Sequence, residues 1–180
     1  MNRVTTFYNQ HLGKKVHEKL LMLTPHLFKP FDLLPASLTE HLISVMLNKI
    51  FLPAINEDEL SFVAGNWLEL TITDADFCCY ITLVEGIDDS YLQVEIELPK
   101  AINKADVVFH ADSQSLLLLA SKKVDPDTLF FKRKLLVTGN TELGLAIKNF
   151  IDDYQVFDAF SEPVQRIIKR FQKQWSQINA

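Results

Sequence analysis

The chain has 180 residues, of which 48% are hydrophobic and 23% are charged, and its formal net charge is −5. This length suits one domain with appendages, and the negative charge argues against nucleic-acid binding by the protein as a whole. The two cysteines, Cys78 and Cys79, are neighbours, so no separated pair can form a disulfide that staples the fold. This usage is typical of a protein of the reducing cytosol.

Residues 1–35 are expected to form a basic arm that precedes the main domain. The first 30 residues carry five lysines or arginines but one glutamate, and they contain no apolar stretch typical of a signal peptide. Pro25, Pro30 and Pro35 then break the end of the arm into a hinge-like stretch. Apolar residues of the arm recur every four positions, as on one face of a helix: Val4, Tyr8, Leu12, Val16 and Leu20.

A helix is expected to follow the arm. Ser37 and Glu40 have the spacing of a capping box, which predicts a start at Ser37, and Pro53 is expected to end the helix. The residues expected to face the core are Leu38, Leu42, Val45, Met46 and Ile50.

The middle of the chain alternates apolar and polar residues, which is the period of a strand with one buried face. The alternation covers residues 68–73, 77–83, 92–98 and 106–111. A turn at 86–90 is expected to join the second and third of these strands as a hairpin. The sheet is therefore predicted to be mainly antiparallel.

Helical signals return after the last of these strands. Asp112 or Ser113 can cap a short helix, and residues 125–127 (Asp-Pro-Asp) are a strong signal for the start of another. A short strand is expected at 135–138, followed by a helix capped by Asn140. Together these elements predict an α+β fold. The last helix is expected to place one face on the core: Leu143, Ile147, Phe150, Ile151 and Tyr154.

The C-terminal tail, from Pro163 onward, is amphipathic. Its apolar residues fall at helical spacing and its cations fill much of the remaining surface. One interpretation is a helix that docks on the sheet or on another subunit. The other is a helix at a membrane surface, with its cations facing anionic lipid headgroups. The residues that would then contact the membrane are Arg166, Lys169, Arg170, Lys173 and Trp175.

Motifs of catalysis are absent from the sequence. It has no glycine-rich phosphate loop and no nucleophile elbow, and its five histidines lack zinc-site spacing. We therefore expect no enzyme, cofactor or metal, although distant residues can still assemble a site. The basic run 132–134, near Lys122 and Lys123, is either a solvated face or a docking patch for anionic lipids or an acidic partner.

One block of sequence carries a family resemblance. Residues 125–135 (DPDTLFFKRKL) and 139–149 (GNTELGLAIKN) resemble the signature of the UbiT proteins, bacterial members of the sterol carrier protein type 2 superfamily. Shorter blocks at 23–25, 59–68 and 105–112 match in the same order. The resemblance covers about residues 20–155. The family usually has aspartate where this chain has Asn140, and both residues can cap a helix.

The resemblance implies a curved, mainly antiparallel sheet covered by helices, with an apolar cavity for an acyl or isoprenoid tail. The expected organisation is an arm at 1–35, a lipid-binding domain at 36–155 and an amphipathic helix at 156–180. Apolar patterning and the resemblance together predict the residues that border the cavity: Phe109, Leu117, Phe130, Phe131, Leu143, Ile147 and Phe150. Phe130 and Phe131 can instead belong to the core, and Gly144 allows either close helix–sheet packing or room for a ligand.

The same resemblance implies a non-catalytic accessory role in oxygen-independent ubiquinone biosynthesis, beside the UbiU and UbiV proteins. The bound molecule would be a prenylated quinone precursor or a phospholipid, and no cofactor is expected. The protein would work in the cytoplasm with transient contact at the inner membrane. Two alternatives remain: a scaffold that organises biosynthetic enzymes and, less favoured, an acyltransferase-like enzyme.

Overall fold

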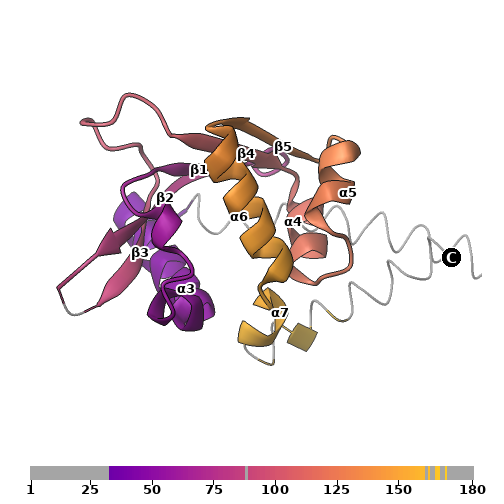
Figure 1. The fold of residues 1–180 in the computed structure, drawn as a ribbon. Coiled ribbons are helices and arrows are strands. Elements are labelled where there is room, and N and C mark those ends of the chain that lie inside the picture. Colours follow the sequence, from indigo (N-terminus) through magenta and orange to yellow (C-terminus); the bar gives the residue numbers. More distant parts are fainter. Residues whose placement is uncertain (1–32, 88, 161, 163–164, 167–168, 170–180) are drawn as a thin grey trace, which may run out of the picture.

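The computed structural model describes residues 33–87, 89–160, 162, 165, 166 and 169. Five strands form one sheet in the order β3-β2-β1-β4-β5, and helices cover one of its faces (Figure 1). The strands are β1 (Leu68–Ile72), β2 (Phe77–Glu85), β3 (Ser90–Glu95), β4 (Val107–Ala111) and β5 (Leu135–Gly139). The helices are α3 (Ala36–Asn56), a 3-10 turn η2 (Ser61–Val63), α4 (Ser113–Ala120), α5 (Pro126–Phe131), α6 (Thr141–Asp153) and α7 (Val156–Ala159). The predicted α+β class is confirmed.

Most neighbouring strands are antiparallel, as predicted. The exception is the central pair, β1 and β4, which run parallel. The hairpin between β2 and β3 is confirmed, and its turn is closed by the Gly86 N–H, which donates to the Asp89 carbonyl at 3.1 Å. The register places Leu70 of β1 opposite both Cys79 of β2 and Phe109 of β4, so apolar side chains share one face.

Two clusters of buried side chains lie on that face. The first packs beneath α3 and includes Ile43, Ala54, Leu60, Phe77 and Ile81. The second packs beneath α4, α5 and α6 and includes Val107, Phe109, Leu119, Leu143 and Ile147. Side chains that pack against both clusters are only partly buried, and we call this set the junction: Phe62, Leu68, Leu70 and Leu116.

Three predicted helix caps are confirmed. The Asp112 carboxylate accepts from the Ser115 N–H at 2.7 Å, and the Asp125 carboxylate accepts from the Thr128 N–H at 2.7 Å. The Asn140 side chain accepts from two N–H groups in the first turn of α6. Each cap satisfies backbone donors that the first turn of a helix leaves unpaired. These signals are local, which is why they could be identified in the sequence.

The predicted capping box at the start of α3 is wrong. The helix begins at Ala36 with Pro35 at its N-cap, and no side-chain cap bond forms there. Glu40 instead accepts from the Ile96 N–H at 3.0 Å. The backbone beyond β3 leaves that donor unpaired at the sheet edge, and the carboxylate satisfies it.

The expected inward face of α3 is also wrong for four of its five residues. Ile50 is buried at 5% exposure, as predicted. The four exposed residues, between 42% and 54% exposed, are Leu38, Leu42, Val45 and Met46. The helix is apolar on two faces, so helical spacing alone does not select the face that meets the sheet. The face that does so contains Thr39, Ile43, Ile50 and Ala54.

Polar side chains of α3 hold it along the open edge of β3. The Asn48 amide donates to the Leu92 carbonyl and accepts from the Leu92 N–H, both at 2.7 Å. The Ser44 hydroxyl donates to the same carbonyl at 2.7 Å. Asn48 thus pairs with β3 as another strand would, and α3 covers an edge that would otherwise be free to pair with another chain.

Of the described helices, α3 alone is long and apolar enough to cross a membrane, judged by length and composition. Its packing on β3 is that of a helix covering a sheet, and core helices of water-exposed domains meet the same criterion.

Three of these helices end in the same kind of turn. Asp58, Lys122 and Arg133 follow α3, α4 and α5 in the left-handed backbone region, with φ of 57°, 54° and 55°. After α5, the Arg133 N–H donates to the Phe130 carbonyl and the Lys134 N–H donates to the Leu129 carbonyl. This is the Schellman pattern, in which glycine is the usual residue at the left-handed position.

Candidate functional site

The apolar face of the sheet is incompletely covered at its centre. Val107 and Phe109 on β4 are 0% and 4% exposed. Their register partners on β1, Leu68 and Leu70, are only half-buried, although β1 is the middle strand of the sheet. Close-packed interiors normally bury such positions fully. At the junction, therefore, the apolar face of the sheet is only partly covered.

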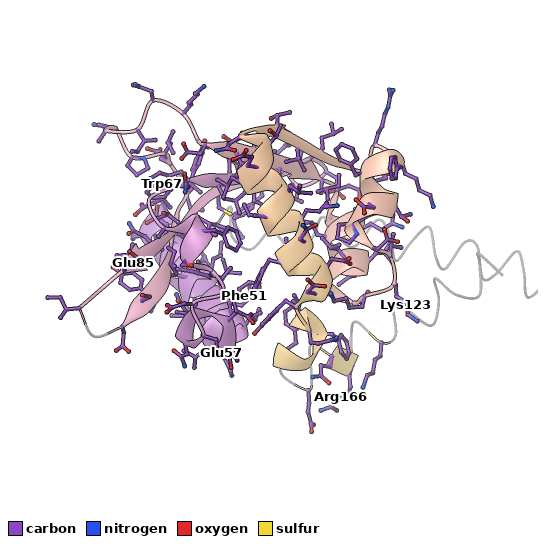
Figure 2. All side chains as sticks on the ribbon, viewed as in Figure 1. Phe51, Glu57, Trp67, Glu85, Lys123 and Arg166 are labelled. Carbon is purple, nitrogen blue, oxygen red and sulfur yellow. The ribbon has the colours of Figure 1, made fainter. Side chains whose placement is uncertain are left out.

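Aromatic rings gather where α3 and α6 flank this region. Phe51 of α3 lies 5.8 Å from Phe150 of α6 and 5.2 Å from Tyr154, measured between ring centroids. Phe150 stacks on Tyr154 at 5.1 Å and meets Phe62 edge-on at 6.4 Å. Figure 2 shows Phe51 between α3 and α6. These rings form an apolar wall across the gap between the two helices.

A cleft of about 400 Å³ opens beside these rings, between the ends of α3 and α6. This volume falls within the range of roughly 300–1,000 Å³ that is typical of small-molecule sites. Its inner part is apolar and its mouth carries carboxylates. The lining residues are Pro53, Ala54, Glu57, Glu59, Phe150, Asp153, Tyr154 and Gln155.

The electrostatics of the cleft follow from its acids. Glu57, Glu59 and Asp153 give its mouth a negative potential. Burial, and then the charges of Glu59 and Glu57, raise the pKa of Tyr154. Its hydroxyl therefore stays protonated and donates to the Ile50 carbonyl at 2.8 Å, which ties α6 to α3. The cleft suits a ligand with a long apolar part and a headgroup that is not anionic.

The predicted cavity residues fall into four groups, of which the exposed pair, Phe130 and Phe131, is described below. Phe109, Leu143 and Ile147 belong to the second core cluster and are at most 7% exposed. Leu117 is half-buried on α4. Phe150 is the predicted residue that the structure places at the cleft. Whether these side chains touch a lipid remains a prediction.

The interpretation of Phe130 and Phe131 as core residues is wrong, while their contact with a lipid stays a prediction. Phe130 is 46% exposed and Phe131 is 81% exposed, while their neighbour Leu129 is 4% exposed and packs in the core. With only six residues, α5 presents a single side of one turn to the second cluster, and Leu129 occupies that side.

The two interpretations of Gly144 are now separable. A Cβ atom at this position would lie 2.7 Å from Cγ1 of Val137 and 3.4 Å from Cγ2 of Val107. Gly144 is therefore the point of closest approach between α6 and the sheet. It leaves no room for a ligand there.

Several residues of the site were not predicted from the sequence. Phe51, Phe62 and Tyr154 form the aromatic wall, and Leu68 with Leu70 forms the floor of the junction. Tyr154 and the leucines were assigned to apolar faces, but no local pattern distinguishes a half-covered face from a buried one. The available signal was the high content of phenylalanine, of which the chain has 13.

The buried thiol of Cys79 on the apolar face is poorly suited to chemistry. Burial raises the pKa of Cys79 to about 12, and the proximity of Cys78 adds to this effect. Cys78 points to the opposite face, where its sulfur accepts from the Thr71 hydroxyl at 3.8 Å. In the part of the chain that the structure describes, no three His, Cys, Asp or Glu side chains gather as a metal site would require.

Several basic residues near α5 form ion pairs or hydrogen bonds within the fold. Lys134 pairs with Asp112 at 2.9 Å, and Lys148 pairs with Asp127 at 2.5 Å. Lys122 donates to the carbonyl groups of Ile151 and Asp152 at the end of α6. Thus part of the predicted basic patch stabilises the fold itself.

The predicted membrane-contact residues lie largely outside the described residues. Arg166 is exposed and lies 3.6 Å from Glu162, and Lys169 lies 5.5 Å from the ring centre of Phe157. The remaining three, Arg170, Lys173 and Trp175, are not described, nor is the arm at 1–32. Membrane contact by this tail stays a prediction.

Comparison with known proteins gives consistent matches. Residues 47–152 match the model of the SCP-2 sterol transfer family. The ubiquinone biosynthesis accessory factor UbiT of Escherichia coli K12 is 36% identical over 140 residues, covering 77% of this chain and 75% of that protein. UbiT of Escherichia coli O157:H7 matches to the same extent. Among solved structures, the UbiJ-SCP2 ubiquinone synthesis protein superposes with a TM-score of 0.50 at 20% identity, covering 66% of this chain and 93% of that one. The last likeness supports the fold alone.

Proposed function

Because the chain belongs to the SCP-2 sterol transfer family and is a homologue of UbiT, we propose that it is a lipid-binding accessory factor of ubiquinone biosynthesis. The family resemblance predicted from the sequence is confirmed. The observation that carries the proposal is the half-buried floor of the junction, Leu68 and Leu70, beside a cleft with aromatic walls. An apolar ligand would complete the burial of that floor.

The proposed ligand is a prenylated quinone precursor. Burying about ten methylene groups would contribute roughly 8 kcal/mol before the cost of ordering the tail. The carboxylates Glu57, Glu59 and Asp153 at the mouth repel an anionic phospholipid headgroup but not a neutral aromatic one. Charge therefore favours the quinone precursor over an anionic phospholipid as the occupant.

The proposed role is non-catalytic. Cys79 is a buried thiol of the apolar face and Tyr154 lines the cleft, and burial raises the pKa of both. Both therefore stay protonated at neutral pH, so neither acts as a nucleophile. The protein would act by shielding the tail and presenting the headgroup. We take residues 36–155 as the lipid-binding domain, flanked by the arm and the tail.

The proposed pathway is the oxygen-independent route, beside UbiU and UbiV, as the resemblance to UbiT implies. The alternative, a scaffold for biosynthetic enzymes, has one observation in its favour. The outer face of α3 exposes a row of large apolar side chains that fits a protein partner: Leu38, Leu42, Val45, Met46 and Leu52.

A carrier of so apolar a molecule must exchange it at a membrane. We propose that the protein works at the cytoplasmic surface of the inner membrane. The cationic tail and the basic arm remain candidates for this contact, each basic residue contributing about 1 kcal/mol near an anionic surface.

Deletion of the gene, with quinone profiling, tests the function. Complementation should use wild type, Leu116→Trp to fill the junction, and Leu136→Trp as a control on an exposed position of β5. The expected result is loss of ubiquinone without oxygen, restored by wild type and the control but not by Leu116→Trp. Unchanged ubiquinone in the deletion strain under both conditions would overturn the proposal. Full rescue by Leu116→Trp would favour the scaffold.

A further inference from the structure

The turn between α5 and β5 exposes two aromatic side chains, and we call residues 130–133 the corner. Phe131 is 81% exposed and Phe130 is 46% exposed, and their rings lie 6.1 Å apart in an edge-to-face arrangement. Leu129 already supplies the contact of α5 with the core. The two phenylalanines thus contribute little to the fold, and exposed apolar pairs of this kind mark interaction sites.

Two cations stand beside these rings without a partner in the described residues. Lys132 and Arg133 are exposed, and in the part of the chain that the structure describes neither side chain makes a hydrogen bond or ion pair, unlike Lys134 in the same turn, which pairs with Asp112. The nearby carboxylates are otherwise engaged. Asp127 pairs with Lys148, and Asp125 caps the opposite end of α5. The corner therefore presents an uncompensated positive charge together with its apolar surface.

The backbone of Arg133 adds an independent observation. Its φ of 55° is in the left-handed region, where an arginine costs stability relative to glycine. Lys122, with a φ of 54°, offsets this cost because its ammonium group bonds the carbonyl groups that end α6. Arg133 has no such bond within the described residues. Within the described residues, the Arg133 side chain therefore makes no hydrogen bond or ion pair that would offset this strain.

We propose that the corner docks on an anionic lipid bilayer. Phe131 inserts at the boundary between headgroups and acyl chains, and Lys132 and Arg133 bind lipid phosphates. The corner places exposed aromatic rings next to exposed cations, the combination that suits the boundary between anionic headgroups and acyl chains. This surface is distinct from the cleft and from the tail, and the proposal does not depend on which lipid the protein carries.

Co-sedimentation of the full chain with vesicles tests the proposal. The probes are phosphatidylcholine vesicles with and without phosphatidylglycerol, at two salt concentrations. Wild type should bind the anionic vesicles, and Phe131→Ser should weaken that binding about tenfold. Lys132→Gln and Arg133→Gln should each weaken it about fivefold and reduce its dependence on salt. Phe131 is mostly exposed, so these variants should fold normally.

Two further variants make the test specific. Arg133→Gly should weaken vesicle binding while the thermal midpoint stays unchanged or rises, because glycine adopts this backbone conformation without strain. Ile87→Ser removes another fully exposed apolar side chain, in a turn flanked by Glu85 and Asp89, and should leave binding unchanged. The proposal is overturned if wild type binds both vesicles equally. It is also overturned if the corner variants bind like wild type while removal of residues 163–180 abolishes binding.

Discussion

Helices α6 and α3 flank the same central strand, but different contacts hold them on the sheet. α6 lies against β4 and β5 through apolar contact, with Gly144 at the closest point. α3 lies along the edge of β3 and is held there by hydrogen bonds from Ser44 and Asn48 to Leu92. The half of the face under α6, which we call the closed half, is thus held by packing, whereas the half under α3 combines the packing of Ile43, Ala54 and Ile55 with hydrogen bonds at the sheet edge.

This difference explains the open junction. A helix fixed to the sheet edge by polar bonds does not have to move inward to bury β1, so Leu68 and Leu70 stay half-covered. The bond from Tyr154 to the Ile50 carbonyl then sets the distance between the two helices. The lipid site that we propose lies where the two kinds of attachment meet.

The largest expected effect is on stability, and it should differ between two leucines of α4. Leu119 is 8% exposed in the closed half, whereas Leu116 is half-buried at the junction. Leu119→Ala should lower the free energy of unfolding by about 3 kcal/mol, because it leaves a cavity in a packed core. Leu116→Ala should cost about half as much. Urea denaturation of lipid-free protein measures the free energy of unfolding of both variants. Equal decreases for Leu119→Ala and Leu116→Ala would contradict a partly covered junction.

The edge attachment is tested by Asn48→Ala. This change leaves the Leu92 N–H and carbonyl without their Asn48 partners, which should cost about 2 kcal/mol. It also uncovers the β3 edge, so the variant should aggregate more readily. The control is Lys49→Ala at the next, exposed position. Thermal melting and light scattering provide the readouts, and an unchanged midpoint for Asn48→Ala would show that α3 is held by packing alone.

The close approach of α6 is tested by Gly144→Ala. The added methyl group would meet Val137, at a cost of about 1–3 kcal/mol, and the better helix propensity of alanine offsets about 1 kcal/mol of it. A net loss of about 1 kcal/mol is expected in denaturation experiments. Leu145→Ala, at an exposed position of the same helix, is the matched control. A stabilised Gly144→Ala variant would mean that α6 is not in close contact.

The smallest expected effect is a pH dependence at the start of α4, in the closed half. Burial raises the pKa of Asp112, but hydrogen bonds from Ser115 and Lys134 outweigh burial and hold it below the ordinary 3.8. This carboxylate therefore stabilises the fold above about pH 4, and the contribution is lost as the pH falls through the lowered pKa. Asp112→Asn keeps a capping side chain, but it should make the free energy of unfolding depend less on pH below 4. If the free energy of unfolding depends on pH as steeply in the variant as in wild type, Asp112 does not make this contribution.

The sequence predicted the parts of the fold that depend on local signals. Each of these signals depends on a few neighbouring residues: the alternation in β1 to β4, the turn after β2, and the caps Asp112, Asp125 and Asn140. Such signals act before any tertiary contact forms, so they can be identified without knowing the neighbours. The strand β5 and the α+β class followed from the same reasoning.

The wrong predictions concern residues whose roles are set by distant partners. Glu40 has the spacing of a cap but bonds Ile96, which is 56 positions away. Leu42 and Ile50 look equally apolar, and only the position of the sheet decides which is buried. Phe131 was expected either in the core or at the wall of a cavity; the core interpretation is wrong, because Leu129 occupies the inward position of α5. The cleft itself depends on the distance between α3 and α6, which no local pattern encodes.

The most direct test of the central claim is the lipid content of the purified protein. Native mass spectrometry should find wild type carrying one apolar molecule, released by organic solvent and identified as prenylated. Leu116→Trp should be largely empty, and Leu136→Trp should be loaded like wild type. A wild-type protein that neither co-purifies with a lipid nor binds an added prenylated aromatic would contradict the account, as would full loading of Leu116→Trp.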